Sequence, residues 1–433
     1  MNPRLHAMSL PDAAAAIADG RITARALADA ELVRIDATDH GIEAWAALDA
    51  AHVRACADAC DRNHRHAPLA GLGIGVKDIF ATRALPTRMG SPAFAGWEPT
   101  DDAACVARLE AAGGYVFGKT VTTELAFMHP GKTHNPWNSA HTPGGSSSGS
   151  AASVAAGHVT GAIGTQTNGS IIRPAAYCGV VGFKPTLGTL PIEGVYLFSE
   201  TFDTAGTFSR DVAGAGRLAS ALASPGLLPG TPPPRAAPPR LGWLPAFPWT
   251  TVAGALGGAL EKTATMLEHS GAIVTRVALP AEVHRALELH RTIMLVEGAR
   301  NLSELQSRAR AQLSATLNAG LDEGRATSAG AYREAQDERL RAIEILTRWL
   351  SPFDAIVTPA VPSAAPRGLT ATGDPSCCTL WSLVGFPALA LPFGLDATGL
   401  PLALQLAAPS GADAGLLSVA RWCEERLPFV GLA

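Results

Sequence analysis

Two short glycine-bounded motifs contain residue types that could do chemistry, and the first suggests phosphate binding. Residues 113–120, Gly-Gly-Tyr-Val-Phe-Gly-Lys-Thr, match the P-loop pattern letter for letter. A phosphate cradle needs a strand before the loop and a helix N-terminus after it, so that backbone N–H groups point at the anion. Here residues 104–112 have a helical pattern, the two glycines end it, and residues 115–117 have a strand pattern. Because this order is reversed, the sequence does not favour nucleotide binding.

The second motif, Gly-Ser-Ser-Ser-Gly at 145–149, fits the nucleophile elbow of hydrolases that use a Ser-His-Asp triad. That elbow requires a hydrophobic strand directly upstream and a histidine base later in the chain. Residues 135–143, Asn-Pro-Trp-Asn-Ser-Ala-His-Thr-Pro, are typical of a loop, and the last histidine, His290, has no pattern around it. A Ser-His-Asp esterase therefore stays open only as an alternative.

A third and longer run of glycine and serine is far more specific. It spans residues 144–157, continues as Gly-Thr-Gln-Thr-Asn-Gly-Ser-Ile-Ile-Arg-Pro-Ala at 164–175, and ends with Gly-Phe-Lys-Pro at 182–185. A flexible linker would lack the apolar helical stretch at 151–156 and would not continue into Val-Val-Gly-Phe. The run therefore indicates a folded site.

Together with Gly-Val-Lys-Asp at 75–78, this run resembles the amidase signature family of serine hydrolases, and within it most resembles the malonamidase branch. The resemblance covers nearly the whole chain, including Gly-Lys-Thr at 118–120, Asp-Ala-Ile-Val-Thr-Pro at 354–359 and Gly-Leu-Pro-Leu-Ala-Leu-Gln-Leu at 399–406. It implies one α/β/α domain, in which helices cover both faces of a large mixed β-sheet. It also implies an amidohydrolase acting on carbon–nitrogen bonds other than peptide bonds.

Acyl transfer needs a nucleophile, a base to deprotonate it and donors for the oxyanion. The resemblance assigns the nucleophile to Ser170 and the base to Lys77, which acts through Ser146 after a cis peptide bond between Gly145 and Ser146. The separation of 24 residues between the two serines agrees with the family. The resemblance also assigns the oxyanion hole to backbone N–H groups of Thr167, Asn168, Gly169 and Ser170.

Lysine usage gives an independent reason to expect special lysines. The chain has five lysines against twenty-nine arginines, and arginine cannot lose its proton. A lysine here therefore tends to mark a place where arginine would fail, although some, such as Lys184 before Pro185, must be structural. Lys77 can act as a base only if it is neutral, so its pKa must fall from about 10.4 through desolvation. Its apolar neighbours at 74–76 and 79–80 favour burial.

Two further positions concern the substrate. Arg173 follows Ser170 by three residues, so a helical turn would point it toward the acyl pocket. In the malonamidase branch the matching arginine binds the substrate's free carboxylate by a two-pronged contact; the alternative is a structural ion pair with Asp203. Asn168 stands where the family usually has glycine. Asparagine tolerates left-handed backbone, but its side chain would narrow the pocket. Nearby polar residues are expected to be scaffold: Thr165, Gln166, His129 and Asp203.

We therefore expect an amidase that works through an acyl-enzyme on Ser170, on a small carboxylate-bearing amide such as malonamate. Carbamate (urethane) and aryl-amide or ester hydrolysis are the alternatives. A tRNA-dependent amidotransferase subunit is less favoured, because the chain is acidic, has the arginine-bearing variant of the signature and lacks a basic surface run. A catalytically silent binding protein is disfavoured, because all three reacting residues are present. No metal and no cofactor are expected.

The elements that must position these residues fall into five blocks of one domain, residues 1–433. They are expected to be N-terminal helices, a signature core, a proline-rich connection, a variable helical segment that shapes the acyl pocket, and a return to the core. Helical patterns in the first block include residues 22–35 and 44–59. The boundaries are 1–66, 67–222, 223–250, 251–350 and 351–433.

Composition sets the class of protein. Of 433 residues 47% are hydrophobic and 17% charged, which suffices for a large core and excludes disorder for most of the chain. The net charge of −4 gives no support for nucleic-acid binding. Seven scattered cysteines indicate free thiols in a reducing compartment. We expect a cytoplasmic protein with a small amide substrate, no nucleic-acid or membrane partner and, from the resemblance, a homodimer.

Overall fold

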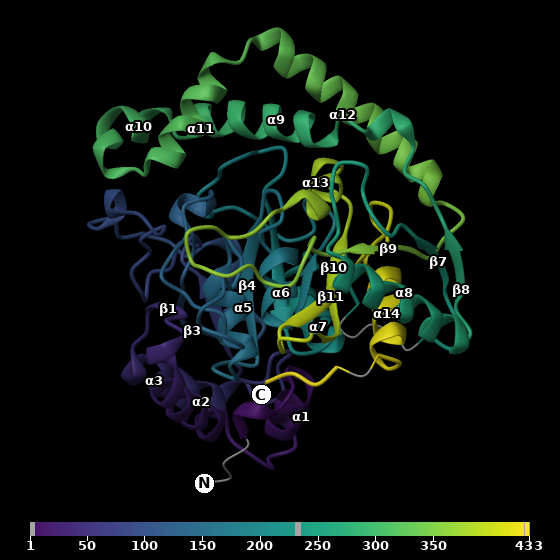
Figure 1. Cartoon of the computed structure of the whole chain (residues 1–433). Coiled ribbons are helices and arrows are strands. Elements are labelled where there is room, and N and C mark those ends of the chain that lie inside the picture. The colour runs from purple at the N-terminus through teal and green to yellow at the C-terminus, as the bar shows by residue number, and fades with distance from the viewer. Residues whose placement is uncertain (1–4, 230–234, 428, 433) are drawn as a thin grey trace.

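The computed structural model describes residues 5–229, 235–427 and 429–432, and within them the strands form one mixed sheet (Figure 1). The strand order is β1-β3-β2-β4-β6-β5-β10-β11-β9-β7-β8. The trios β3-β2-β4 and β9-β7-β8 are parallel, and the other neighbours are antiparallel. The strands are β1 (Trp45–Ala47), β2 (Gly73–Lys77), β3 (Tyr115–Thr120), β4 (Gly161–Gln166), β5 (Val181–Lys184), β6 (Thr204–Ser209), β7 (Arg240–Trp243), β8 (Ile273–Arg276), β9 (Ala355–Pro359), β10 (Ala388–Leu395) and β11 (Pro401–Ala407).

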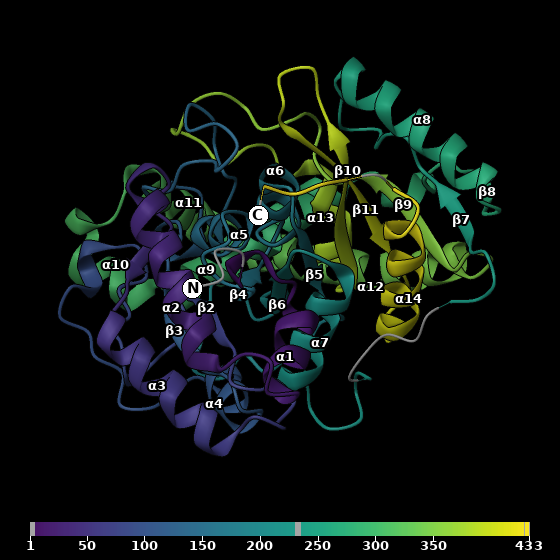
Figure 2. The ribbon, with the colours of Figure 1, turned by 90° about the horizontal axis from the view of Figure 1, so that it is seen from below.

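Helices cover both faces of this sheet, as predicted. Helices α5 and α6 pack together on one face, and α7 and α14 on the other. Helices α9 to α12 form an outer layer at the top of Figure 1, and α1 to α3 lie at the opposite side (Figures 1 and 2). The helices are α1 (Leu10–Ala18), α2 (Ala24–Thr38), α3 (Ala50–Asn63), α4 (Ala104–Ala111), α5 (Ser148–Ala155), α6 (Ile172–Cys178), α7 (Val212–Leu222), α8 (Gly254–His269), α9 (Ala286–Asn301), α10 (Ser303–Ala309), α11 (Ala315–Ala326), α12 (Ala329–Leu350), α13 (Ser376–Leu383) and α14 (Asp413–Glu424).

The helix predicted over residues 44–59 is wrong in its first part. Strand β1 occupies part of that stretch and pairs with β3, and α3 begins only at Ala50. The boundary lies at Asp49, whose carboxylate accepts hydrogen bonds from the backbone N–H groups of Ala51 and His52. Such N-capping satisfies donors that the first helical turn leaves unpaired, so it fixes where the helix starts.

In each of the two short motifs, the second glycine of the pattern is a packing feature. Helix α4 precedes the P-loop-like run and β3 lies within it, in the order predicted for a false match. A Cβ atom on Gly118 would lie 2.8 Å from the Trp45 ring. A Cβ atom on Gly149 would lie 2.2 Å from the Ala44 carbonyl oxygen, because α5 packs tightly against the chain there. Both glycines are therefore required by close packing.

The site is positioned by the ends of two parallel strands. Strands β2 and β4 are parallel neighbours, so their carboxyl ends meet at one edge of the sheet. Lys77 is the last residue of β2, and β4 ends at Gln166, directly before the signature loop. Ligands of α/β proteins bind at such carboxyl edges.

The five-block division of the chain stays a prediction, and residues 230–234 of its proline-rich connection lie outside the described residues. Within the described ranges, none of the helices combines the length and apolar character that a membrane crossing requires.

Candidate active site

The Lys77 side chain is fully buried, and its Nζ atom contacts two hydroxyl groups. Nζ lies 2.8 Å from Ser146 Oγ and 2.7 Å from Thr165 Oγ1. The peptide bond between Gly145 and Ser146 is cis, as the resemblance implied. A neutral amine has two N–H groups and one lone pair, so it can donate to Thr165 and accept from the Ser146 hydroxyl. Thr165, expected to be scaffold, thus contacts the proposed base directly.

Burial lowers the pKa of Lys77 into the range that a general base needs. Desolvation lowers the pKa of Lys77 from 10.5 to about 7, while the negative charge of Asp203 acts in the opposite direction. A base whose pKa lies near the working pH is neutral in a large fraction of molecules and still accepts a proton effectively. The environment of Lys77 therefore suits proton transfer.

Two other lysines are also buried, but their contacts are structural. Lys119 donates to the Phe80 carbonyl and to threonine hydroxyls, and pairs with Asp78 at 3.3 Å. Lys184 donates to the Pro185 carbonyl at 2.9 Å, as expected for a structural lysine. Of the remaining two, neither is fully buried. Lysine scarcity therefore narrows the choice of base, and the contact with Ser146 distinguishes Lys77.

The buried Lys77 predicts the pH dependence of the reaction. Below pH 7 the ammonium has no lone pair, so kcat/KM should rise about tenfold per pH unit and level off above pH 7. The measurement is kcat/KM for ammonia release from an amide substrate between pH 5 and 9. Lys77→Arg, which keeps a positive charge that cannot be lost, should be inactive throughout. A wild-type profile without an acidic limb would contradict a neutral Lys77 base.

Ser170 lines a pocket, and its hydroxyl is not engaged by a neighbouring side chain of the described residues. Its hydroxyl makes no hydrogen bond with any described residue, and the residue is buried apart from its face on the pocket. The Ser147 N–H donates to the Ser170 carbonyl at 3.4 Å, so the segments of Ser146 and Ser170 run side by side. Among the described contacts, no hydrogen bond joins the two hydroxyls themselves. Catalytic hydrogen bonds often form only with substrate present, so this arrangement is compatible with a relay.

The loop after β4, part of which lines the pocket, has backbone donors without partners. The N–H groups of Asn168, Gly169 and Ser170 have no acceptor among the described residues. The loop is closed by Gln166, whose Oε1 accepts from the N–H groups of Ile171 and Ile172 at 2.8 and 3.0 Å. Unpaired N–H groups beside a nucleophile are what an oxyanion hole requires.

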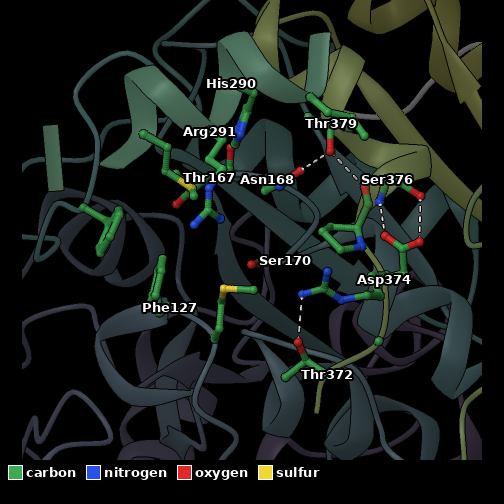
Figure 3. Close-up of a pocket in the computed structure, with 18 residues that line it drawn as sticks. Phe127, Thr167, Asn168, Ser170, His290, Arg291, Thr372, Asp374, Ser376 and Thr379 are labelled. Carbon is green, nitrogen blue, oxygen red and sulfur yellow. Dashed lines mark hydrogen bonds between the residues drawn. The ribbon is translucent and has the colours of Figure 1, made fainter. Parts of the chain in front are cut away.

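Side chains from distant elements hold this loop, and Figure 3 shows His290 and Thr379 beside Thr167 and Asn168. Thr167 donates its hydroxyl to Asp203 Oδ1 at 2.5 Å, and its carbonyl lies 3.0 Å from His290 Nε2 on α9. The Asn168 side chain, expected to narrow the pocket, lines it but is bound to the Thr379 hydroxyl at 2.8 Å. His290 therefore contacts this loop and not a serine of the 145–149 run, so the Ser-His-Asp alternative is wrong.

The pocket has a volume of about 220 Å³, which suits a small substrate. Its walls come from residues 126–128, residues 167–173, Phe198, residues 287–294 of α9, and residues 372–379. The helical block at 251–350 therefore contributes to the pocket through α9. Among the described residues, no cluster of three or more metal-ligating side chains could hold a metal ion.

Arg173 is the buried positive charge of this pocket. Its Nη2 donates to the Gly145 carbonyl at 2.8 Å and to the Thr372 hydroxyl at 3.1 Å, but Nε and Nη1 have no acceptor among the described residues. The alternative of an ion pair with Asp203 is wrong, because Asp203 binds Thr167 and two backbone N–H groups. A guanidinium that is only 6% exposed and lacks a carboxylate partner invites an anionic ligand.

The sequence profile of the amidase family matches residues 26–417. The chain belongs to the amidase family. It is 34% identical to the A subunit of the glutamyl-tRNA(Gln) amidotransferase of Anaeromyxobacter dehalogenans, over 97% of this chain and 96% of that relative. A solved amidase structure has a TM-score of 0.88 at 31% identity and covers 97% of this chain and all of the other. The peptide amidase of Stenotrophomonas maltophilia has a TM-score of 0.81 at 28% identity, with 97% of each chain covered.

These relatives confirm the family and an enzyme acting on carbon–nitrogen bonds, but they correct the expected function. Curated relatives with 30–34% identity over nearly their full length are named as this same amidotransferase subunit, the possibility that the sequence argument disfavoured. The expected hydrolase of malonamate, carbamates or aryl amides is therefore wrong. The form of the signature sequence around Arg173 suggested the malonamidase branch. That sequence is short, however, and the similarity to the amidotransferase subunit extends over nearly the whole chain.

The expectation of a small-molecule partner alone, without nucleic acid, is also wrong by this comparison. The relatives are named as subunits of an enzyme of glutamyl-tRNA(Gln). Net charge misled the argument because it reports the nonspecific attraction of one chain for phosphates, whereas one subunit of an assembly need not itself hold the RNA. The homodimer stays a prediction.

Proposed function

We propose that this chain is the ammonia-releasing subunit of a tRNA-dependent amidotransferase, and that it hydrolyses the side-chain amide of an amino-acid donor such as glutamine. The observation that supports this most is the 34% identity to an amidotransferase subunit over nearly the full length of both chains. The malonamidase branch is not part of the proposal. A cytoplasmic location is part of it, because glutamyl-tRNA is a substrate of the cell interior and all seven cysteines are free thiols.

The site supports a complete acyl-transfer cycle. Lys77 accepts the hydroxyl proton of Ser146, and Ser146 in turn accepts the hydroxyl proton of Ser170. At the same time, Ser170 Oγ attacks the amide carbon. The resulting oxyanion accepts hydrogen bonds from the free backbone N–H groups of Asn168, Gly169 and Ser170. As the C–N bond breaks, the same relay protonates the departing ammonia. Water then attacks the ester, and the products are the donor's carboxylate and ammonia.

The charges in the pocket fit a donor that is itself an amino acid. Arg173 offers a buried, unpaired guanidinium for a carboxylate. Asp374 lines the same pocket, and its carboxylate is held by the Ser376 N–H at 2.8 Å and the Ser376 hydroxyl at 2.9 Å (Figure 3). Each carboxylate oxygen has further acceptor capacity for an ammonium. An α-carboxylate and an α-ammonium are what glutamine presents at the end remote from its amide.

The test is substitution into an amidotransferase. This chain would replace its counterpart in the amidotransferase from Anaeromyxobacter dehalogenans, and conversion of glutamyl-tRNA(Gln) to glutaminyl-tRNA(Gln) would be measured with glutamine as donor. We expect conversion, together with ammonia release from glutamine that exceeds release from butanamide or malonamate. Failure to support conversion, combined with equal turnover of the neutral amide, would overturn the proposal.

A further inference from the structure

We propose that His290 is a positioning residue: from α9, it fixes the direction in which the oxyanion-hole N–H groups point. This inference rests on the proposed acyl transfer at Ser170. Sequence patterns assign His290 no role, and it lies 123 residues from the loop that it contacts. In Figure 3 its side chain projects from α9 toward the loop that contains Thr167 and Asn168.

The geometry of the peptide bond connects His290 to the hole. In a trans peptide the C=O of one residue and the N–H of the next point in opposite directions within one plane. His290 Nε2 lies 3.0 Å from the Thr167 carbonyl oxygen. A carbonyl can only accept, so the histidine proton must be on Nε2. Holding this carbonyl on the α9 side therefore aims the Asn168 N–H to the other side.

The next peptide unit is held in the same way by a different element. The Ser382 hydroxyl of α13 donates to the Asn168 carbonyl, which fixes the opposite Gly169 N–H. Ser382 is itself placed by Gln166, whose Nε2 donates to it at 3.0 Å. Two successive carbonyls are thus held by side chains of α9 and α13, and the N–H groups that follow them are left free on the other side of the loop. Hydrogen bonds to the carbonyls also polarise these peptides and strengthen their N–H donors.

His290 is held rigidly enough for this task. It is buried and stacks on Phe202, with ring centres 4.4 Å apart and planes 12° apart. Seven residues later, on the same face of α9, Glu297 accepts hydrogen bonds from the hydroxyls of Ser199 and Thr201, both at 2.5 Å. Burial lowers the pKa of His290 to about 4, so the ring stays neutral in the working range. The ring therefore has little freedom to turn away from the loop.

The experiment compares two variants with opposite hydrogen-bonding ability. His290→Phe keeps a ring against Phe202 but removes the donor, whereas His290→Gln keeps an N–H at a similar reach. With p-nitrophenyl acetate as a substrate that needs neither Arg173 nor a partner, His290→Phe should lower kcat about 30-fold and leave KM within about threefold. His290→Gln should recover most of that loss.

A transition-state analogue gives a readout that packing alone would not move. A trifluoromethyl ketone forms a tetrahedral adduct with a serine hydroxyl. In His290→Phe its inhibition constant should therefore rise by the same factor by which kcat falls, whereas the affinity for acetamide should be unchanged. Equal losses in both variants, or an unchanged kcat in His290→Phe, would overturn the role of His290. Undiminished activity in Ser170→Ala would instead overturn the proposed acyl transfer, so the two failures are distinguishable.

Discussion

Replacing Ser170 with alanine is expected to lower kcat/KM for ammonia release from glutamine by about 10⁴-fold or more. The variant has no nucleophile, while the oxyanion donors and the pocket remain, so only the weak catalysis that they provide to water would persist. The measurement is ammonia release under single-turnover conditions. Labelling by phenylmethylsulfonyl fluoride, followed by mass spectrometry, should modify Ser170 in the wild type and nothing in the variant.

The same serine-rich tract offers a matched control. Ser148 begins α5 and donates its hydroxyl to the Val121 carbonyl at 3.3 Å, away from the pocket. Ser148→Ala should keep kcat/KM within about threefold of wild type, because the loss of a hydroxyl remote from the pocket acts mainly on stability. Residues that act as one unit are not additive, so Ser170→Ala combined with Lys77→Met should lose no more than Ser170→Ala alone. If the loss of kcat/KM in the double variant equalled the product of the two single-variant losses, Lys77 and Ser170 would act separately.

Replacing Arg173 with methionine is expected to raise KM for glutamine about 100-fold with a smaller effect on kcat. Removing one partner of a buried, hydrogen-bonded charge pair costs about 2–5 kcal/mol of binding, and 100-fold corresponds to about 2.7 kcal/mol. The loss should depend on the substrate. For 4-aminobutanamide, which is glutamine without its α-carboxylate, wild type and variant should have kcat/KM values within about threefold.

Arg291 is the natural comparison for Arg173. It lines the same pocket from α9, but its side chain is half exposed and makes two hydrogen bonds to Glu323 at 2.7 and 2.5 Å. Because this guanidinium already has a carboxylate partner, Arg291→Met should change KM for glutamine by less than about threefold. If Arg173→Met reduced turnover of both substrates equally, the arginine would be supporting the fold at Gly145 and Thr372 and not binding a carboxylate.

The grouping of Lys77, Ser146 and the signature loop was expected from the resemblance of several motifs to one family, because no local pattern connects Lys77 with Ser146 across 69 residues. Strands β2 and β4 have short apolar patterns, and the spacing of 24 residues between the two serines is a property of the chain alone. The fold is predictable for the same reason, since matching stretches occur from β2 to β11. Lysine scarcity also limits the candidate bases to five residues, of which Lys77 is one.

His290 and the function could not be predicted in this way. His290 reaches Thr167 through the packing of α9, and no periodic pattern encodes such a contact across 123 residues. The sequence suggested Asp203 only as scaffold or as a partner of Arg173, whereas tertiary packing places it under Thr167 and near Lys77. Net charge led the sequence argument away from the subunit role. It is a property of the whole chain and says little about which surface a partner covers.

The division of the pocket between stretches of chain has a practical consequence for protein engineering. The reacting groups Lys77, Ser146 and Ser170 sit on the central sheet and its adjoining segments, whereas much of the rim comes from residues 287–294 and 372–379. A combinatorial library confined to rim positions such as Arg291 and Met294, with His290 left intact, would sample new amide donors without disturbing the buried lysine. Part of the pocket wall can therefore change independently of the reacting groups, whereas Arg173 and His290 connect the rest of the wall to Gly145 and Thr167 of the catalytic segments.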